Sequence, residues 1–263
     1  MNGLTNKQMD KKTLLFTTIG KLNEETYKNS ADAFESWGGF DVVVFGEDLE
    51  QHTQICDKYG FTLDTNYERS EFGLPLVRGL FQSIKRYSGY DVYCYLNSDI
   101  KFPSSPQYII DKIEDDNFLL VGQRLDVYSD GKEELHNPGG IDYYFYTPDF
   151  WDLSDMPDFS IARGRFDHWL MGKAYTSGNG NVIDLTKEWI PIHPEPIKRV
   201  SGDPAVLFGN DTNPKMGYQI LRNNYWFAKA RLHGQTDMAK FYVEDGKVKQ
   251  RDNKVKNEFN ILF

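Results

Sequence analysis

Cysteine is scarce in this sequence, and long apolar runs are absent. Only Cys56 and Cys94 occur among 263 residues, the first within a helix-like pattern and the second within an apolar, strand-like run. A disulfide framework and a thiolate zinc site are therefore disfavoured. No segment approaches the roughly 20 apolar residues that cross a bilayer, and residues 1–12 have no apolar signal core. We expect a soluble, cytoplasmic protein with reduced cysteines.

Basic residues are also outnumbered, by 39 acidic to 30 basic, which gives a formal net charge of -9. A duplex DNA-binding surface needs clustered cations and is disfavoured, although a modified nucleic-acid acceptor stays open. An apolar content of 40% in a chain of this length predicts one large domain with a substantial core. The aromatic content of 15% suits stacking on bases or sugar rings, but aromatic residues more often serve a core.

The order of sequence patterns predicts an α/β fold. Short β-branched or aromatic runs alternate with helix-period segments, which is typical of βαβ units and a mainly parallel sheet. We expect strands at 13–19, 41–46, 61–63, 91–96 and 118–122, and helices at 23–37, 48–59, from Pro75 to near Gly89, and at 105–115. Asn23 is the expected N-cap of the first helix, and Gly60 closes the second.

The second half of the chain is rich in loops. Binding groups collect on loops at the carboxyl ends of strands in such sheets. We expect one Rossmann-like domain over 1–243, with a nucleotide-binding half at 13–125, an acceptor half at 126–243, and a segment after about Val200 that folds back beside the site. The charged tail at 244–263 is expected to be a solvated extension whose end docks through Phe259, Ile261, Leu262 and Phe263.

The stretch Tyr93–Ile100 (YCYLNSDI) carries the clearest chemical signal. An apolar strand that ends in Asn97, Ser98 and Asp99 places a carboxylate at the open edge of the sheet. Such an oxygen ligand suits a hard divalent cation that bridges two phosphates. The same three residues also suit an ordinary turn after a strand.

The Asn97-Ser98-Asp99 triplet resembles the DxD motif of GT-A glycosyltransferases, and other parts of that family's site follow in order. Residues 14–21 (LLFTTIGK) resemble its first nucleotide-binding strand and loop, and 72–80 (FGLPLVRGL) the segment before the DxD helix. Residues 136–146 (HNPGGIDYYFY) resemble its glycine loop, 163–170 (RGRFDHWL) its xED segment and 190–194 (IPIHP) its C-terminal histidine motif. The resemblance covers about residues 14–232.

This resemblance implies a glycosyltransferase with Mn²⁺ or Mg²⁺ held by Asp99 and His193, and Asp167 as the catalytic base. Asn97 departs from the DxD motif, so Asp99 is expected to carry the ion, and the xED segment Arg165-Phe166-Asp167 keeps the terminal carboxylate but lacks the acid before it. The donor is a UDP-, GDP- or dTDP-sugar, and the acceptor is a glycan or another hydroxyl compound. Donor-binding residues are expected to be Thr17, Thr18, Arg78, Asn97, Ser98, Asp99, Gly139 and Gly140. Acceptor-binding residues are expected to be Asp142, His168 and Trp169.

Each of these residue types also has a purely structural interpretation. Asp167 suits the N-cap of a helix that begins at His168, and His193 suits a hydrogen-bonded loop histidine. Gly139 and Gly140 bring the backbone close to a donor sugar or supply positive φ in a turn. Arg78 suits a surface ion pair. For the tryptophans Trp151, Trp169 and Trp226, core packing competes with a role as stacking platforms.

Two rival functions remain at this point. Asn97 and the altered xED segment are compatible with a non-catalytic nucleotide-sugar or glycan-binding protein. A nucleotidyltransferase would share the fold class and the metal, but it normally has a Gly-rich basic loop after its first strand. Here that loop offers only Gly20 and Lys21, so this alternative ranks lower.

Overall fold

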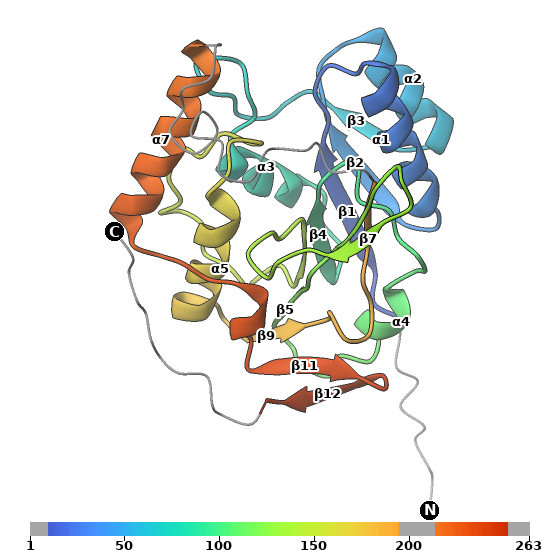
Figure 1. Ribbon diagram of the computed structural model, residues 1–263, viewed down its shortest axis with the longest axis vertical. Helices are drawn as coiled ribbons and strands as arrows, with labels where there is room; N and C mark the ends of the chain where they lie inside the picture. The colour runs from blue at the N-terminus through green and yellow to red at the C-terminus, as the bar shows by residue number, and fades with distance from the viewer. Residues whose placement is uncertain (1–9, 195–213, 252–263) are drawn as a thin grey trace, which may run out of the picture.

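A large sheet runs through the centre of the molecule and has helices on both faces (Figure 1). The computed structural model describes residues 10–194 and 214–251. Within these residues, nine strands form the large sheet in the order β12-β11-β9-β5-β8-β4-β1-β2-β3, and three form a small sheet in the order β10-β6-β7. The predicted α/β fold with a mainly parallel sheet is confirmed.

The first half of the chain folds as the predicted series of strand–helix units. Its elements are β1 (Thr13–Thr18), α1 (Glu24–Ser36), β2 (Asp41–Phe45), α2 (Glu50–Tyr59), β3 (Thr62–Asp64), α3 (Val77–Ser83), the 3-10 helix η1 (Ile84–Arg86) and β4 (Val92–Leu96). Strand β1 pairs in parallel with both β2 and β4, and β2 pairs in parallel with β3. Parallel pairing brings the carboxyl ends of these strands to one edge of the sheet.

The ends of the first two helices confirm the predicted caps. The side chain of Asn23 accepts a hydrogen bond from the Thr26 backbone N at 2.8 Å, and the Thr26 hydroxyl accepts one from the Asn23 backbone N at 2.8 Å. This reciprocal pair satisfies two backbone donors at the start of α1. Helix α2 ends at Gly60, whose φ of 70° lies in the left-handed region that glycine adopts without strain.

The second half adds antiparallel strands to the parallel ones. Its elements are α4 (Gln107–Ile110), β5 (Phe118–Val121), β6 (Leu125–Val127), β7 (Glu133–Leu135), β8 (Tyr143–Tyr146), α5 (Phe166–Ser177), β9 (Asn181–Asp184), β10 (Ile192–Pro194), α7 (Pro214–Ala230), the 3-10 helix η2 (Thr236–Met238), β11 (Phe241–Glu244) and β12 (Lys247–Gln250). Strand β8 lies between β4 and β5 and is antiparallel to both. Strands β5, β9 and β11 are parallel neighbours.

Two segments differ from the sequence predictions. The helix expected at 105–115 is only the single turn of α4, because hydrogen bonds from Lys112 N to Ile109 O and from Ile113 N to Ile110 O close the chain into turns. The expected tail begins with structure, since β12 pairs antiparallel with β11 and extends the large sheet beyond residue 243. The predicted docking of Phe259, Ile261, Leu262 and Phe263, and the start of the segment after Val200, lie outside the described residues.

The core consists of two apolar clusters, one on each face of the sheet. Successive β1 residues alternate between them, with Leu14 and Phe16 in one cluster and Leu15 in the other, as the period of a strand requires. Helices α1 and α2 pack on the Leu15 side, whereas α3 and α5 pack on the Phe16 side. No helix in the described part of the chain is long and apolar enough to cross a membrane.

Both cysteines should be inert toward thiol reagents in the folded protein. Cys56 and Cys94 are 1% and 0% exposed, and burial, followed by the charge of Asp57, raises the pKa of Cys56 to about 12. Because the thiolate is the reactive form, we expect almost no labelling by a disulfide reagent at pH 8 and two equivalents after denaturation. Rapid labelling of the native protein would contradict the packing described here.

Candidate active site

The candidate site lies at the carboxyl end of β4, where Asn97, Ser98 and Asp99 follow the strand. A hydrogen bond from Ile100 N to Asn97 O at 3.1 Å closes these residues into a turn. From the sequence, the triplet could be a turn or a ligand site. In the structure it is a turn, and its Asn97 and Asp99 side chains contact Asp142 and His193. All three side chains are half-buried, so they lie at the surface of the site and not in the core.

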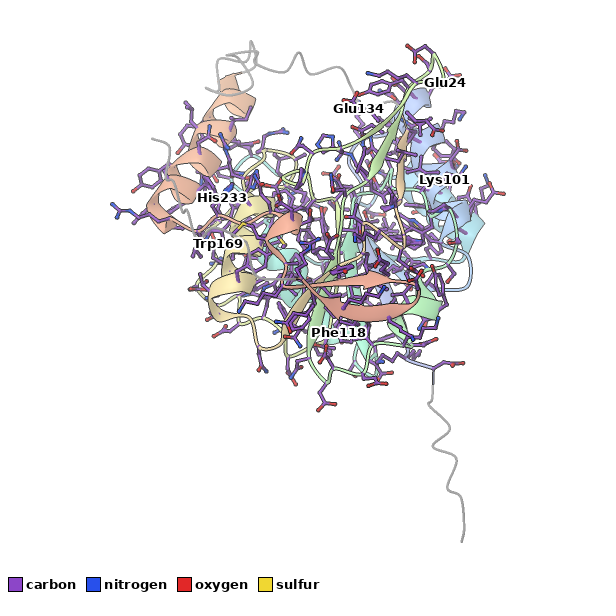
Figure 2. The ribbon with its side chains drawn as sticks, turned by 60° about the horizontal axis from the view of Figure 1, so that its bottom comes forward. Glu24, Lys101, Phe118, Glu134, Trp169 and His233 are labelled. Carbon is purple, nitrogen blue, oxygen red and sulfur yellow. The ribbon has the colours of Figure 1, made fainter. Side chains whose placement is uncertain are left out.

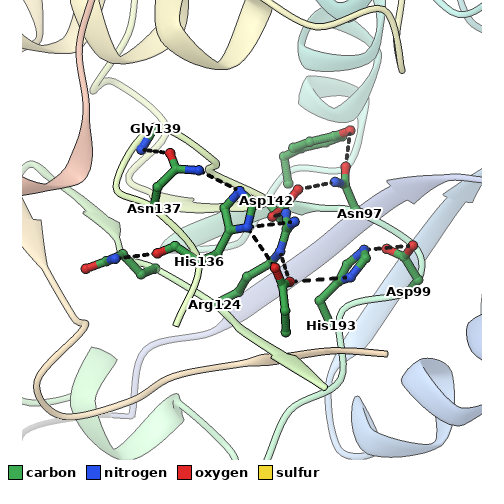
Figure 3. Close-up of polar contacts among 11 residues, drawn as sticks. Asn97, Asp99, Arg124, His136, Asn137, Gly139, Asp142 and His193 are labelled. Carbon is green, nitrogen blue, oxygen red and sulfur yellow. Dashed lines mark hydrogen bonds and ion pairs between the residues drawn. The ribbon is translucent and has the colours of Figure 1, made fainter. Parts of the chain in front are cut away.

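Strand β10 brings His193 to this turn. Ile192 exchanges two backbone hydrogen bonds of 2.8 Å with Lys101, just after Asp99. On its other side β10 pairs in parallel with β6, with His193 opposite Asp126. As a result the His193 Nε2 atom lies 3.3 Å from Asp99 Oδ2, and Nδ1 lies 3.7 Å from Asp126 Oδ1 (Figure 3).

The Asp99–His193 pair fits the donor set that a divalent cation takes in a phosphate site. A carboxylate oxygen and an imidazole nitrogen face each other, and both suit Mn²⁺ or Mg²⁺. Burial raises the pKa of Asp99, but the hydrogen bond and charge of His193, together with a backbone hydrogen bond and the charge of Arg124, leave that pKa below its usual value. The buried Nδ1 of His193 has no hydrogen-bond partner among the described residues and points toward Asp126, as a metal-binding histidine points to a supporting carboxylate.

Asp99 and His193 are two protein ligands that the structure offers to a divalent cation at this position. In the described ranges, no group of three or more His, Cys, Asp or Glu side chains is arranged to hold a metal ion. Mg²⁺ and similar ions in nucleotide sites commonly take one or two protein ligands and complete their shell with phosphate oxygens and water. Two protein ligands therefore fit an ion that binds together with a diphosphate.

Asp126 is the centre of a polar cluster that the sequence analysis missed. It accepts hydrogen bonds from Arg124 Nε at 2.7 Å and from His136 Nδ1 at 2.8 Å. Burial raises the pKa of Asp126, but Arg124 and His136 together leave it below its usual value. The available signal was the run of polar residues directly after β5, at the carboxyl end of a central strand.

Asn97 is held at both ends of its side-chain amide. Its Nδ2 donates to Asp142 Oδ1 at 2.6 Å, and its Oδ1 accepts from the Tyr95 hydroxyl at 3.1 Å. Asp142, predicted to bind the acceptor, is 9% exposed and also forms an ion pair with Arg124. Asn97 and Asp142 thus hold the Asp99 turn to the start of β8, and Asn97 directs a donor, not a negative charge, at Asp142.

Restoring the usual aspartate at this position should destabilise the protein. In Asn97→Asp a second carboxylate would face Asp142 across 2.6 Å, and like charges this close raise the pKa of one of them above its unfolded value. As the pH rises, this carboxyl group loses its proton more readily in the unfolded state than in the folded state. The loss of folding stability is therefore small below about pH 4 and grows above it. We expect a loss of about 1–3 kcal/mol at pH 8, measured by urea unfolding. The exposed Asn179→Asp should show no such pH-dependent loss.

Asp167 lies in the first turn of α5. This helix begins at Phe166 after Arg165, whose φ is 73°, so Asp167 is not the N-cap of a helix that starts at His168. Its Oδ1 accepts a hydrogen bond from the His168 backbone N at 2.9 Å. Burial, and then the charges of Asp99 and Asp167, raise the pKa of Tyr95. Both carboxylates are therefore within electrostatic reach of the same tyrosine at the end of β4.

The two predicted loop glycines are required for close packing, not for positive φ. Neither Gly139 nor Gly140 is among the described residues with positive φ. A Cβ atom on Gly139 would lie 2.9 Å from the His168 ring, and one on Gly140 would lie 2.2 Å from the His136 ring. The glycine loop thus packs against His168 of α5 and folds onto its own His136, and the turn interpretation based on positive φ is wrong.

His168 itself belongs to a pair of stacked imidazoles. Its ring lies 4.6 Å from that of His233 at an interplanar angle of 23°, and its Nδ1 lies 3.2 Å from the carbonyl oxygen of Gly234. Figure 2 shows His233 and Trp169 on the side of the molecule formed by α5 and α7. The stack joins the first turn of α5 to the chain after α7. His168 follows Asp167 directly in the chain, and its ring also packs against Gly139 of the glycine loop.

The remaining predicted residues lie at varied depths. Thr17 and Thr18 end β1 next to the end of β4; Thr17 is 0% exposed, and its hydroxyl has no partner among the described residues. Arg78 pairs with Glu68 at 3.1 Å and Asp158 at 2.9 Å, which is its alternative role as an ion-pair residue. Trp169 is 1% exposed, so in this structure it is a core residue and presents no face to an acceptor.

Solved structures of glycosyltransferases are similar to this chain in fold. The mannosyltransferase PcManGT from Pyrobaculum calidifontis, solved with GDP-Man and Mn²⁺, superposes with a TM-score of 0.50 over 84% of this chain and 73% of its own, at 8% identity. The chain has a GT-A fold. TarS of S. aureus, solved with UDP-GlcNAc, has a TM-score of 0.47 at 16% identity over 80% of this chain and 70% of its own. No family model and no curated protein matches the sequence.

Proposed function

We propose that this GT-A-fold chain is a metal-dependent glycosyltransferase that moves a sugar from a nucleotide diphosphate donor to a hydroxyl acceptor. The observation that carries the proposal is the Asp99–His193 pair, 3.3 Å apart at the carboxyl edge of β4. This is where open α/β sheets bind their ligands. A bound Mn²⁺ or Mg²⁺ would neutralise the charge that develops on the departing diphosphate.

The donor side of the site is the shared edge of β1 and β4. Thr17 and Thr18 end one strand, and Asn97, Ser98 and Asp99 follow the other. Asp99 and His193 would hold the ion against the diphosphate, while the Asp126 carboxylate orients the imidazole. The glycine loop at Gly139 and Gly140 lets the backbone come close to the donor sugar. PcManGT, with GDP-Man and Mn²⁺ in its structure, supports a donor and an ion of this class.

Asp167 is the proposed base on the acceptor side. It would take the proton from the acceptor hydroxyl while that oxygen forms a bond to the anomeric carbon and the bond to the diphosphate breaks. Attack opposite the leaving group inverts the anomeric centre. His168, whose backbone N donates to Asp167, would contact the acceptor, and Asp142 would support Asn97 through their 2.6 Å hydrogen bond.

A ligand screen tests the proposal directly. We expect UDP, GDP or dTDP, or one of their sugars, to raise the melting temperature only with Mn²⁺ or Mg²⁺ present, because a ligand that binds the native state stabilises it. Incubation with the matching donor should then release free nucleoside diphosphate. Metal-dependent binding without any release, across acceptors of several classes, would favour the non-catalytic binding protein instead.

A further inference from the structure

Helix α7 buries two amide side chains against the protein and leaves three large side chains exposed to solvent. Gln219 and Asn223 are 2% and 0% exposed. The Asn223 side chain donates to the carbonyls of Ser160 at 2.9 Å and Gly164 at 3.0 Å. Trp226, Phe227 and Ala230 of the same helix pack against the core, as the apolar stripe of a surface helix usually does, so α7 has apolar residues on its inner and its outer side. Burying two amides is tolerated here only because backbone and side-chain partners satisfy them.

Three large side chains occupy the outward side of the same helix. Tyr218, Leu221 and Tyr225 are 53%, 50% and 58% exposed, and their spacing of three and four residues places them on one face. Phe72, which is 36% exposed, extends this surface, with its ring 5.5 Å from that of Tyr218. We refer to Phe72, Tyr218, Leu221 and Tyr225 as the α7 face. A contiguous apolar patch of this kind marks an interaction site.

The charges of this helix differ from those of the chain as a whole. The sequence of α7, PKMGYQILRNNYWFAKA, contains no aspartate or glutamate, although acidic residues outnumber basic ones 39 to 30 in the chain. Lys229 is exposed and lies over the rings of Trp226 and Tyr225, at 5.2 Å and 5.9 Å. Arg222 is already paired with Glu71 at 2.5 Å. The α7 face therefore offers aromatic and aliphatic groups with a cation beside them.

We propose that the α7 face binds the surface of a membrane that contains anionic lipids. The tyrosine rings, with their polar hydroxyl tips, favour the boundary between headgroups and acyl chains, where Leu221 and Phe72 would also be buried. Lys229 is placed to meet lipid phosphate, an attraction that adds to apolar burial. This assignment does not depend on the proposed glycosyltransferase activity.

Other occupants fit the face less well. A glycan needs neutral hydrogen-bonding side chains beside the rings, but Gln219 and Asn223 point inward, and the Asn224 side chain accepts a hydrogen bond from Arg165 at 2.9 Å. A second copy of the chain would bring together two helices that both lack acidic residues, so their charges would not be complementary. A bilayer with anionic headgroups can bury the apolar side chains of the α7 face and can also pair with Lys229.

Membrane binding through α7 would also bring the candidate site close to the membrane surface. Arg165, hydrogen-bonded to Asn224, and Gly164, hydrogen-bonded to Asn223, belong to the segment just before α5, in whose first turn Asp167 lies. The helix that rests on the lipid surface would thus hold the segment that carries Asp167. An acceptor presented at a membrane surface would be close to this segment.

Vesicle co-sedimentation of the full chain tests the assignment. We expect binding to vesicles of phosphatidylcholine with phosphatidylglycerol, little binding to phosphatidylcholine alone, and weakening by salt. The triple variant Tyr218→Ser, Leu221→Ser, Tyr225→Ser should lower vesicle affinity by at least about tenfold, because it removes most of the apolar contact. Lys229→Gln should lower it about fivefold on anionic vesicles only.

A matched control separates the α7 face from general surface hydrophobicity. Tyr108 and Leu135 are 42% and 45% exposed on other elements, so Tyr108→Ser with Leu135→Ser should bind vesicles as the unmodified chain does. Melting temperatures of all variants confirm that they fold. The proposal is overturned if anionic vesicles fail to bind, or if the triple variant binds them unchanged. It is also overturned if the triple variant instead loses self-association or lipid-free glycan binding.

Discussion

We expect Asp167→Asn to slow the sugar-transfer step roughly 10²- to 10⁴-fold, the usual contribution of a general base. Donor and metal affinity should stay nearly unchanged, because the amide has the same shape and the proposed role of Asp167 is toward the acceptor. The amide oxygen can still accept the 2.9 Å hydrogen bond from His168 N. Loss of a first-turn negative charge should cost only about 0.3–1 kcal/mol of stability. Single-turnover transfer beside a donor titration measures both quantities.

Asp152 provides a matched control for this experiment. Its side chain also accepts a 2.9 Å hydrogen bond from a nearby backbone amide, that of Ser154, but it is exposed. Asp152→Asn should therefore transfer sugar at the normal rate. If Asp167→Asn also stays within a few-fold of the unmodified chain, another group accepts the proton or the reaction retains configuration by a different route.

The second large effect should come from Asp99→Ala, which removes the carboxylate opposite His193. We expect metal-dependent turnover to fall roughly 10²- to 10³-fold, because charge stabilisation at the leaving group is lost. Nucleoside diphosphate binding should also no longer depend on the divalent ion. Calorimetry with the diphosphate, with and without EDTA, measures this dependence.

His193→Ala and a surface variant complete the test of the metal assignment. His193→Ala should weaken the same metal dependence and lower the melting temperature without metal only slightly, because it removes the pair with Asp99, whereas the imidazole Nδ1 has no hydrogen-bond partner among the described residues. The exposed Asp116→Ala should change neither property. Equal diphosphate affinities with and without EDTA, for the unmodified chain and Asp99→Ala alike, would show that these residues hold no ion.

Much of the fold could be predicted from local patterns. The strands of the first half, the cap at Asn23 and the stop at Gly60 follow from apolar runs and from residues with strong local preferences. The helix expected at 105–115 failed because a short apolar pattern cannot distinguish a helix from a turn packed on a sheet. The start of the expected tail failed for a different reason, since an exposed strand such as β12 has mixed polar residues and depends on its neighbour β11 for pairing.

The structure also changed the meaning of several predicted site residues. Gly139 and Gly140 were predicted to approach the donor or to supply positive φ, but the structure shows Gly139 against His168 of α5 and Gly140 against His136 of its own loop. Arg78 was predicted to reach the donor and is engaged by Glu68 and Asp158. Long-range contacts of this kind leave no periodic trace in a sequence.

The sequence by itself determined the alternating strand–helix order and placed Asp99 at the end of a buried strand, because side-chain period and turn chemistry are local properties. Only the tertiary structure brought Asp99 and His193, far apart in the chain, to within 3.3 Å. That contact depends on β10, which pairs with Lys101 on one side and with β6 on the other. Backbone pairing between distant segments fixes the register, and the register decides which side chains meet.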